Sequence, residues 1–440
     1  MKSDEKTINI VYELMSIWHK AGYDATQYVG TMLYVMCLKK MIDENVCMNP
    51  DYMGVILELT KSLYRPTNAD DIETLRKGAE VLESTYSLRQ GLLQDVLTTS
   101  RCQEEQWKKT FVNVVAAIVE TDNYGELAQY MLYKISNERG NEKVSSYTVA
   151  ELLRIASNVK DGESVLDGTV GYGYSAVECI RGKDIRFYGN DINIESIQNT
   201  AMYLILSDVK NFALATEDFT GVNTSGMHDK VIMDIPFGMK VNELIGYQTV
   251  RCKEWMDNVQ CKEMEGLLLA SGLECLNENG RMVVIVPQGF LFKQSKALSS
   301  FRENAVKRGM LKAVVSLPSV YNYTTINTTM LVFEQGNNDV LFVEGAKLIQ
   351  RERRLEPTFL EENKQLLHNI LEKKQVIDNI SFVVPNEEVL NVGEWTITRF
   401  QKTESTISYR TLEEINEELD FCYNRLGELN NYSSKLDLFR

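Results

Sequence analysis

The chain has 440 residues, of which 44% are hydrophobic and 25% charged, so it has room for two or three globular domains and is not intrinsically disordered. Its formal net charge of −15 disfavours unaided binding to DNA, because nonspecific affinity comes mainly from lysine and arginine side chains that neutralise phosphates. The longest apolar runs are too short to span a bilayer and the N-terminus has no apolar signal core, so a cytoplasmic protein with no membrane role is expected.

The cysteines and histidines indicate neither a disulfide framework nor a metal site. Eight cysteines are scattered without a CxxC pair, which predicts reduced thiols and no zinc ribbon. The three histidines, His19, His228 and His368, are isolated, so neither a multi-histidine metal site nor a nucleophile triad is expected. The sequence contains no GxxxxGK[ST] motif, which argues against a P-loop nucleotidase.

Residues 1–138 are expected to form an all-helical N-terminal domain, because their apolar residues recur at helical spacing with few β-type alternations. In residues 139–346 short β-rich runs alternate with amphipathic helices. This alternation predicts an α/β domain with a mostly parallel, Rossmann-like sheet that is covered on both faces. The expected strands are SVLD, FYGND, KVIMDIP, RMVVIVP and LKAVVSLP, and the expected helices cover residues 174–181, 194–206, 262–277 and 295–308.

The segment after these elements is expected to end the sheet and then become helical. The runs TTMLVFEQG and DVLFVEGAKL lie only a few residues apart, which predicts an antiparallel hairpin at the end of the sheet. Residues 347–440 are charged and are expected to form a C-terminal helical region. Within it, residues 411–437 carry a coiled-coil-like heptad seam, and this helix either lies on its own domain or is offered to another chain.

A glycine-rich turn follows the first expected strand in SVLDGTVGYGYSAVECI. Asp167 closes the strand, and Gly168, Gly171 and Gly173 allow the backbone to approach a ligand before the next helix begins. A glycine-rich turn alone is a weak signal for a cofactor site. Further acidic residues are needed to make it specific.

Two such carboxylates follow. Asp191 ends the second expected strand, 18 residues after Gly173, at about the offset where an acidic side chain accepts hydrogen bonds from a ribose. Asp218, in ATEDFTG between the runs FYGND and KVIMDIP, follows what would be a further strand there, where it is placed to meet an adenine edge. Asp167 would repel a pyrophosphate but attract the sulfonium and amino groups of S-adenosylmethionine, which is therefore the expected cofactor.

Asp234 ends an apolar run in DKVIMDIPFGMK. Because Pro236 cannot donate to a sheet ladder, the chain leaves the sheet there and Asp234 is presented at the C-terminal edge of a strand. Ligands bind at that edge in parallel α/β sheets. The alternative interpretation is a carboxylate that only caps a helix or a loop.

These motifs resemble those of the modification subunits of type I restriction-modification systems, which are adenine-N6 DNA methyltransferases. The resemblance covers nearly the whole chain. Residues 167–173 are similar to the family's cofactor loop DPACGTG, and residues 234–238, DIPFG, to its catalytic motif NPPFG. The best-matched tracts are LNENGRMVVIVPQGFLF, residues 276–292, and LKAVVSLPSVYNYTTINTTMLVFEQ, residues 311–335.

The resemblance implies an S-adenosylmethionine-dependent methyltransferase fold that acts on a flipped-out adenine. The Asp234 carboxylate and the Ile235 carbonyl would accept the two amino hydrogens, and Phe237, after Pro236, would stack on the base. The residues implied in cofactor binding are Asp167, Gly168, Gly171, Gly173, Asp191 and Asp218. The implied partners are DNA, bound through a specificity subunit that helix 411–437 contacts, a second modification subunit and a restriction subunit.

The chain departs from the family pattern at three places where the family has proline, namely Val149, Gly168 and Ile235. Aspartate in place of asparagine at residue 234 keeps an acceptor, because an ionised carboxylate only accepts hydrogen bonds. Two alternatives to an active DNA methyltransferase remain. One is a scaffold that keeps the fold but methylates poorly or not at all, and the other is a small-molecule or RNA methyltransferase that works alone.

Overall fold

The computed structural model describes residues 3–47, 49–64, 70–97, 105–119, 121–137, 143–221, 226–239, 241, 254–321, 324–351, 357–401 and 412–437. The chain divides into two compact units, Met1–Arg399 and Phe400–Arg440. The first unit contains an N-terminal helical region and an α/β region. None of the described helices is both long and apolar enough to span a membrane.

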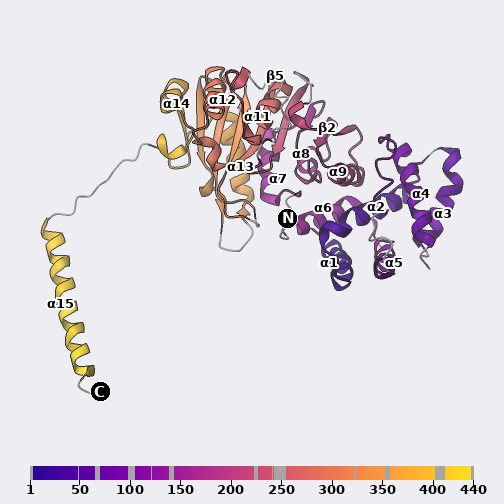
Figure 1. Cartoon of the computed structure of the whole chain (residues 1–440), viewed down its shortest axis with the longest axis horizontal. Helices are drawn as coiled ribbons and strands as arrows, with labels where there is room; N and C mark the ends of the chain where they lie inside the picture. The colour runs from indigo at the N-terminus through magenta and orange to yellow at the C-terminus, as the bar shows by residue number, and fades with distance from the viewer. Residues whose placement is uncertain are drawn as a thin grey trace. The chain divides into compact units, whose positions relative to one another are not determined.

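The N-terminal region is helical, as predicted (Figure 1). Its helices are α1 (Glu5–Lys20), α2 (Ala25–Asp43), α3 (Met53–Tyr64), α4 (Asp70–Thr85), α5 (Glu105–Val119) and α6 (Tyr124–Ser136). Helix α2 is buried along nearly its whole length, because α3, α4, α5 and α6 all pack against it. Trp18 of α1 stacks on Tyr28 of α2 and also contacts Trp107 of α5, so aromatic rings fill part of the core of this bundle.

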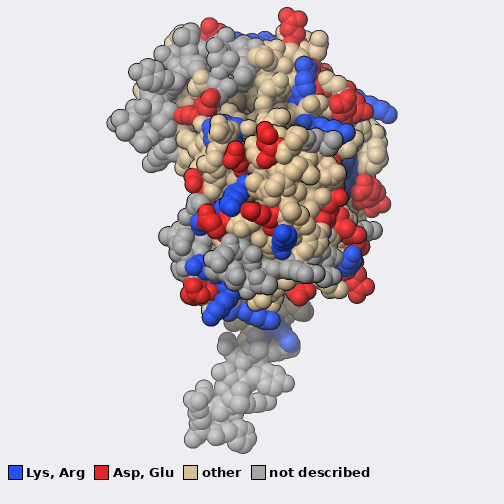
Figure 2. All heavy atoms as spheres, turned by 90° about the vertical axis from the view of Figure 1, so that its right-hand side faces the viewer, with Lys and Arg blue, Asp and Glu red and all other residues tan. Residues whose placement is uncertain are grey.

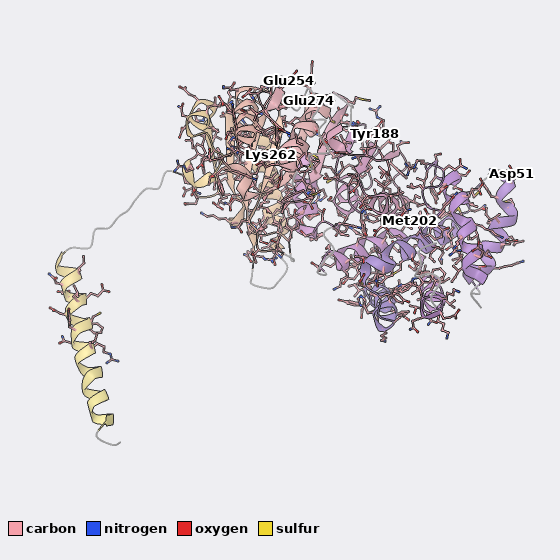
Figure 3. All side chains as sticks on the ribbon, in the orientation of Figure 1. Asp51, Tyr188, Met202, Glu254, Lys262 and Glu274 are labelled. Atoms are coloured by element: carbon pink, nitrogen blue, oxygen red, sulfur yellow. The ribbon has the colours of Figure 1, made fainter. Side chains whose placement is uncertain are left out.

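The helical region is joined to the α/β region where α2 meets α9 (Ile194–Leu206). The Cys37 thiol donates a hydrogen bond to the carbonyl oxygen of Met202, which is labelled in Figure 3, over 3.4 Å. The nearly buried Lys40 Nζ donates to Asp208, just past the end of α9, over 2.8 Å. Buried hydrophobic residues of both regions form one continuous core.

A nine-stranded sheet in the order β11-β8-β6-β7-β5-β4-β1-β2-β3 lies at the centre of the α/β region. Its strands are β1 (Ser164–Asp167), β2 (Arg186–Asp191), β3 (Phe212–Thr216), β4 (His228–Asp234), β5 (Leu276–Pro287), β6 (Leu311–Leu317), β7 (Thr328–Glu334), β8 (Asp339–Glu344) and β11 (Ser381–Pro385). The run β3-β2-β1-β4-β5 is parallel throughout, which confirms the predicted α/β class. A separate antiparallel pair is formed by β9 (Ile349–Gln350) and β10 (Thr358–Phe359).

Helices cover both faces of the sheet (Figure 1). One group of helices that contact one another contains α7 (Tyr147–Ser157), α8 (Tyr174–Ile180), α9 and α13 (Glu361–Lys373). A second group contains α11 (Met264–Cys275), α12 (Lys296–Lys307) and α14 (Asn386–Val392). Because parallel strands are joined by right-handed crossovers and the sheet order reverses direction after β3, the helices α8 and α9, between β1 and β3, and the helix α11, between β4 and β5, lie on opposite faces.

The predicted hairpin between β7 and β8 is wrong. Strand β7 lies between β5 and β6 and is antiparallel to both, whereas β8 lies on the far side of β6 and is parallel to it. The short connection between β7 and β8 passes the beginning of β6. There the Asn337 backbone N–H donates to the Gly309 carbonyl over 2.9 Å, so this residue is not part of a hairpin turn. Loop length alone therefore did not determine which strands pair.

Strand β11 was not predicted from the sequence. It pairs antiparallel with β8 and so extends the sheet after the helix α13. Helix α13 itself is held against α7 by an ion pair between the nearly buried Lys364 and Glu151, with a nitrogen–oxygen distance of 2.5 Å. The predicted domain divisions at residues 138 and 346 remain predictions.

The second unit contains helix α15 (Leu412–Asp437), which lies within the range expected to form the heptad helix. Three of its seam residues, Ile415, Leu419 and Leu426, are 41%, 46% and 58% exposed. An apolar seam of this length is typical of a helix that packs on another helix.

Candidate active site

Three predicted acidic residues are brought to one edge of the sheet. Strand β1 lies between β2 and β4, so Asp167, Asp191 and Asp234 end neighbouring parallel strands. Burial raises the pKa of Asp167 most, and the charges of Asp234 and Asp191 add to the rise. The C-terminal edge of a parallel sheet, where the order of the strands reverses, is the usual place for a ligand.

Asp167 is the most buried of these acids, with 1% of its surface exposed. Its Oδ1 accepts a hydrogen bond from the Thr169 backbone N–H over 3.0 Å, but its buried Oδ2 has no partner among the described residues. Burial raises the pKa of Asp167 to about 8, and the neighbouring charges of Asp234 and Asp191 add to the rise. A cationic ligand group at Oδ2 would remove this penalty.

The glycine-rich turn is tightly constrained, and two of its glycines have no room for a side chain. A Cβ on Gly171, where φ is +54°, would lie 2.4 Å from the Lys143 carbonyl oxygen. A Cβ on Gly168 would lie 2.5 Å from the ring of Phe219. Gly173, with φ of +78°, starts helix α8. The turn is therefore glycine-rich because backbone and an aromatic ring surround it.

Asp191 holds this turn from the end of β2. Its Oδ2 accepts the Gly171 backbone N–H over 3.0 Å and its Oδ1 accepts the Asn193 N–H over 2.8 Å. Burial raises the pKa of Asp191, while these two hydrogen bonds and the charge of Lys143 oppose the rise. Each oxygen keeps a further lone pair, so Asp191 remains able to accept ribose hydroxyls.

Asp218 makes local contacts after β3. Its Oδ1 accepts from both the N–H and the hydroxyl of Thr220, over 2.9 and 2.8 Å, and so starts the short helical turn Phe219–Gly221. The neighbouring residue Glu217 is linked to the glycine turn through Asn190, whose amide donates to the carbonyls of Glu217 and Gly168 over 3.0 and 3.4 Å. A direct role of Asp218 in ligand binding stays a prediction.

Asp234 contacts the glycine turn from the end of β4. The Thr169 hydroxyl donates to the Asp234 backbone carbonyl over 3.4 Å, and the Tyr321 hydroxyl donates to the side-chain Oδ1. Burial raises the pKa of Asp234 to about 6, while hydrogen bonds from Tyr321 and Ser145 lower it. The carboxyl group thus lies beside the turn with a raised pKa.

The rest of the motif follows in a loop that bends at Phe237 and Gly238. Ile235 is 2% exposed, Pro236 is exposed and Phe237 is half-buried. The ring of Phe237 meets the ring of Tyr321 edge to face, with centroids 5.5 Å apart. The Gly238 N–H donates to Glu265 Oε1 of α11 over 2.9 Å, which fixes the end of the motif.

Sequence reasoning missed three residues of this site, Thr169, Asn190 and Tyr321. Thr169 lies inside the glycine turn and Asn190 directly precedes Asp191, so both were adjacent to residues that had been singled out. Tyr321 follows β6 and is 87 residues from Asp234 along the chain. Two signals pointed to it, its position just after a further strand and its place in the tract 311–335 that matches the family.

The donor set fits a ligand with a positive charge and an adenosine moiety. The unpaired Asp167 Oδ2 suits an ammonium group. Among the described residues, no three histidine, cysteine, aspartate or glutamate side chains are placed to hold a metal ion. These residues fit S-adenosylmethionine, which brings an amino group and a sulfonium but no phosphate.

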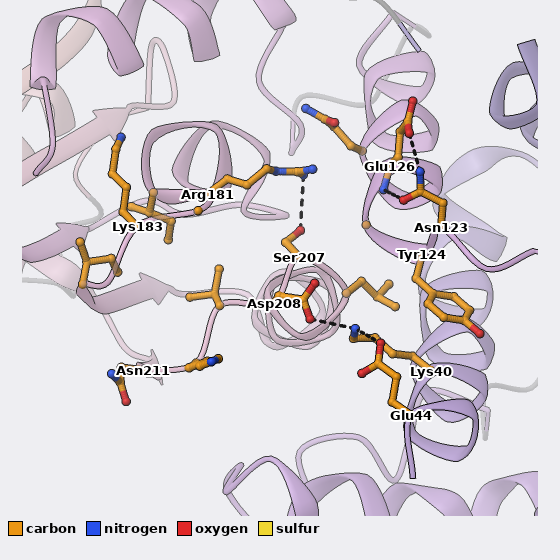
Figure 4. Close-up of a pocket in the computed structure, with 18 of the residues that line it drawn as sticks. Lys40, Glu44, Asn123, Tyr124, Glu126, Arg181, Lys183, Ser207, Asp208 and Asn211 are labelled. Carbon is orange, nitrogen blue, oxygen red and sulfur yellow. Dashed lines mark hydrogen bonds and ion pairs between the residues drawn. The ribbon is translucent and has the colours of Figure 1, made fainter. Parts of the chain in front are cut away.

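A cavity of about 930 Å³ lies away from this site (Figure 4). It is lined by Asp184 and Asn211, which precede β2 and β3, so it lies toward the N-terminal edge of the sheet. Lys40, Asp208 and Arg181 also line it, and Lys40 bridges from α2 to the end of α9. The cavity thus lies at the junction between the helical region and the α/β region. It does not lie at the C-terminal edge of the sheet, where Asp167, Asp191 and Asp234 are.

Comparison with known proteins agrees with this geometry. Residues 119–407, more than half of the chain, match the family model for N-6 DNA methylases. The comparison with curated proteins gives no match. The fold is similar to a type I restriction-modification methyltransferase subunit from Streptococcus thermophilus, at 17% identity over 90% of this chain and 99% of that chain, with a TM-score of 0.76. It is also similar to a modification subunit of a putative type I restriction enzyme from Vibrio vulnificus, at 16% identity over 88% and 94% of the two chains, with a TM-score of 0.62.

These similarities confirm the predicted methyltransferase fold with an N-terminal helical region and the resemblance to type I modification subunits. The match to the family model extends over the glycine turn, the three strand-end acids and the motif that begins at Asp234. The chain therefore belongs to the N-6 DNA methylase family.

Proposed function

We propose that this protein transfers a methyl group from S-adenosylmethionine to the N6 atom of adenine in DNA, as the modification subunit of a type I restriction-modification complex. The observation that carries the proposal is the contact between Asp234 and the glycine turn. Thr169 of the turn donates to the Asp234 carbonyl, and the charge of Asp234 acts on Asp167. A methyl donor held by Asp167 would thus lie beside the groups that hold the acceptor.

The chemistry requires the amino group of adenine to be made nucleophilic and aligned. The nitrogen lone pair is delocalised into the ring, so two acceptors are needed to draw the amino group out of the plane. Asp234 and the Ile235 carbonyl supply them, and Phe237 stacks on the base after it leaves the duplex. The cofactor supplies the methyl group on a sulfonium, and Asp167, Asp191 and the turn orient it. Alignment of the two reactants then lowers the barrier.

Recognition of DNA is assigned to partners. The net charge of −15 disfavours unaided binding, and acidic and basic side chains are interspersed on the face shown in Figure 2. We propose that a specificity subunit selects the sequence, that a second modification subunit completes the complex, and that a restriction subunit joins it. The exposed seam of α15 is the surface proposed to contact the specificity subunit.

The substitution Asp234→Ala tests the proposal. In a complex reconstituted with its specificity subunit, wild type is expected to form N6-methyladenine in DNA. Asp234→Ala is expected to lower the rate by at least about 100-fold, because it removes an acceptor that acts in the transition state. Nucleoside digestion of the DNA measures the product, and thermal unfolding checks that the variant is folded.

A second candidate function is a scaffold that assembles without methylating. It is favoured by Ile235, which replaces a proline of the family motif. Without the proline ring, the backbone angle φ of residue 235 is less fixed beside the catalytic carboxyl group of Asp234. In that case wild type and Asp234→Ala would both assemble and both leave DNA unmodified. Methylation by the isolated chain without any specificity subunit would instead favour the small-molecule or RNA methyltransferase.

A further inference from the structure

Asp234 has a fixed partner that the family motif does not account for. Tyr321 comes from the loop between β6 and β7, and its hydroxyl donates to Asp234 Oδ1. The Tyr321 side chain is 2% exposed, and its ring meets the Phe237 ring edge to face at an angle of 84°. One side chain therefore contacts both the carboxylate and the aromatic ring of the motif.

The backbone around Tyr321 is held in place by several hydrogen bonds. The preceding carbonyl, of Val320, accepts from the buried Ser146 hydroxyl over 2.7 Å. The Tyr321 carbonyl accepts from the Ser319 hydroxyl and from Arg351, each over 3.3 Å. These bonds come from within the loop and from two other segments, and they hold the Tyr321 backbone without involving Asp234.

The charged and polar groups around Asp234 come from several elements. Asp167 faces it from β1 across the glycine turn, Tyr321 faces it from the loop after β6, and Ser145 faces it from the segment before α7. Glu265 of α11 reaches the Gly238 N–H of the same motif. The Tyr321 and Ser145 hydroxyls are the groups that favour the ionised form of Asp234, against the effect of burial.

We propose that Tyr321 is a positioning residue for methyl transfer, and that its hydroxyl holds Asp234 by Oδ1 so that Oδ2 is presented to the adenine amino group. The inference rests on the proposed function. Asparagine, the residue in the family motif, carries one acceptor and one donor, whereas the two oxygens of a carboxylate are equivalent acceptors. Tyr321 makes them inequivalent, because its hydroxyl donates to only one of the two oxygens.

The protonation state of Asp234 then matters for the reaction. A protonated carboxyl group has one carbonyl oxygen, which is its main acceptor, and one O–H group, which donates. Because the Tyr321 hydroxyl donates to Asp234, it takes the carbonyl oxygen and leaves the O–H group. The O–H group would face the amino group of adenine, which offers only donors. Methyl transfer is therefore expected to need ionised Asp234 and to fall as the pH decreases through about 6.

The substitution Tyr321→Phe tests the proposal in the reconstituted complex at saturating S-adenosylmethionine and DNA. At pH 8 the turnover number kcat is expected to fall about tenfold, because a hydrogen bond to a charged group is lost, with little change in KM for DNA. The midpoint of the acid limb of the pH profile is expected to move to higher pH, since a donor that lowers the pKa of Asp234 is gone. Tyr203→Phe, which removes the buried hydroxyl that Arg181 contacts on α9, serves as the matched control and should leave the midpoint unchanged.

The substitution Asp234→Asn completes a double-mutant cycle. Asparagine does not titrate, so the acid limb should disappear in this variant, and adding Tyr321→Phe should then cause no shift of the profile. An unchanged midpoint in Tyr321→Phe would overturn the proposal. An acid limb that persists in Asp234→Asn would overturn it as well, because the limb would then belong to another group.

A measurement without catalysis separates this inference from the proposed function. In the full chain labelled with carboxyl-13C aspartate, the NMR signal that Asp234→Asn removes belongs to Asp234, and its titration gives the pKa directly. A higher pKa in Tyr321→Phe than in wild type is expected, and an equal pKa would refute the hydrogen bond as the control of Asp234. This result holds whether or not the complex methylates DNA, so an inactive wild type would count against the proposed function alone.

Discussion

At the scale of single residues, the Asp167 carboxyl connects stability with ligand binding. It is buried at the end of β1 with one oxygen unpaired, and burial together with two neighbouring acids raises its pKa to about 8. Between the unfolded-state value near 3.8 and this value the folded protein binds more protons than the unfolded chain. The free energy of unfolding therefore falls as the pH rises through this window. Above about pH 8 the whole cost of burying the ionised Asp167 is subtracted from it.

Asp167→Asn is expected to raise thermal stability and weaken cofactor binding at the same time. Asparagine has nearly the same shape but no charge to bury, so Tm at pH 9 should rise by roughly 5 °C, whereas at pH 4 the two proteins should unfold alike. Affinity for S-adenosylmethionine should fall by about tenfold or more, because a charged hydrogen bond is lost. Scanning calorimetry at several pH values and titration calorimetry measure the two effects. A lower Tm at pH 9 would mean that the ionised carboxyl group has an unrecognised partner.

Gly171 and Gly162 give a matched pair for the role of the glycine turn. Both have positive φ, +54° and +87°, but a Cβ would meet the Lys143 carbonyl at 2.4 Å in the first case and nothing within 4 Å in the second. Gly162→Ala should therefore cost only about 1 kcal/mol of backbone strain, whereas Gly171→Ala should cost roughly 2–4 kcal/mol. Urea unfolding measures these costs. Cofactor affinity should fall in Gly171→Ala alone, and equal losses in the two variants would show that the turn is not a binding element.

At the scale of secondary structure, the elements that local patterns determine were predicted and those that depend on sheet order were not. Helix α9, at Ile194–Leu206, has the predicted bounds because apolar periodicity and the cap at Asn193 both mark it. The pairing of β7 depends on its insertion between β5 and β6, which no local signal encodes. The short strand β11 forms because the edge of β8 is available to it, and that edge exists only in the folded sheet.

The same distinction holds for the candidate site. Asp167, Asp191 and Asp234 were found because each ends an apolar run, and parallel strands bring such ends together. Tyr321 was not found because its contact with Asp234 joins segments 87 residues apart. Asp218 also follows a strand, yet its Oδ1 accepts hydrogen bonds from a local turn. A position at the end of a strand therefore predicts where a residue lies, but not which group it binds.

At the scale of the whole molecule, the first unit contains the nine-stranded sheet and the helical region, and the second consists of the segment Phe400–Arg440 with helix α15. The strand-end acids all lie in the first unit. Cofactor binding and assembly with a specificity subunit are therefore expected to be separable, because they use different units of the chain.

Removing residues 409–440 is expected to leave S-adenosylmethionine affinity unchanged and to abolish co-purification with the specificity subunit. A sharper version changes the seam within the full chain. Leu419→Asp combined with Leu426→Asp places two charges on the apolar seam and should lower complex yield at least tenfold, since buried charges at helix contacts are strongly unfavourable. Tyr423→Asp is the matched control, because Tyr423 is 71% exposed and lies off the seam. Normal yield of the complex with the truncated chain would assign assembly to the first unit and leave α15 without this role.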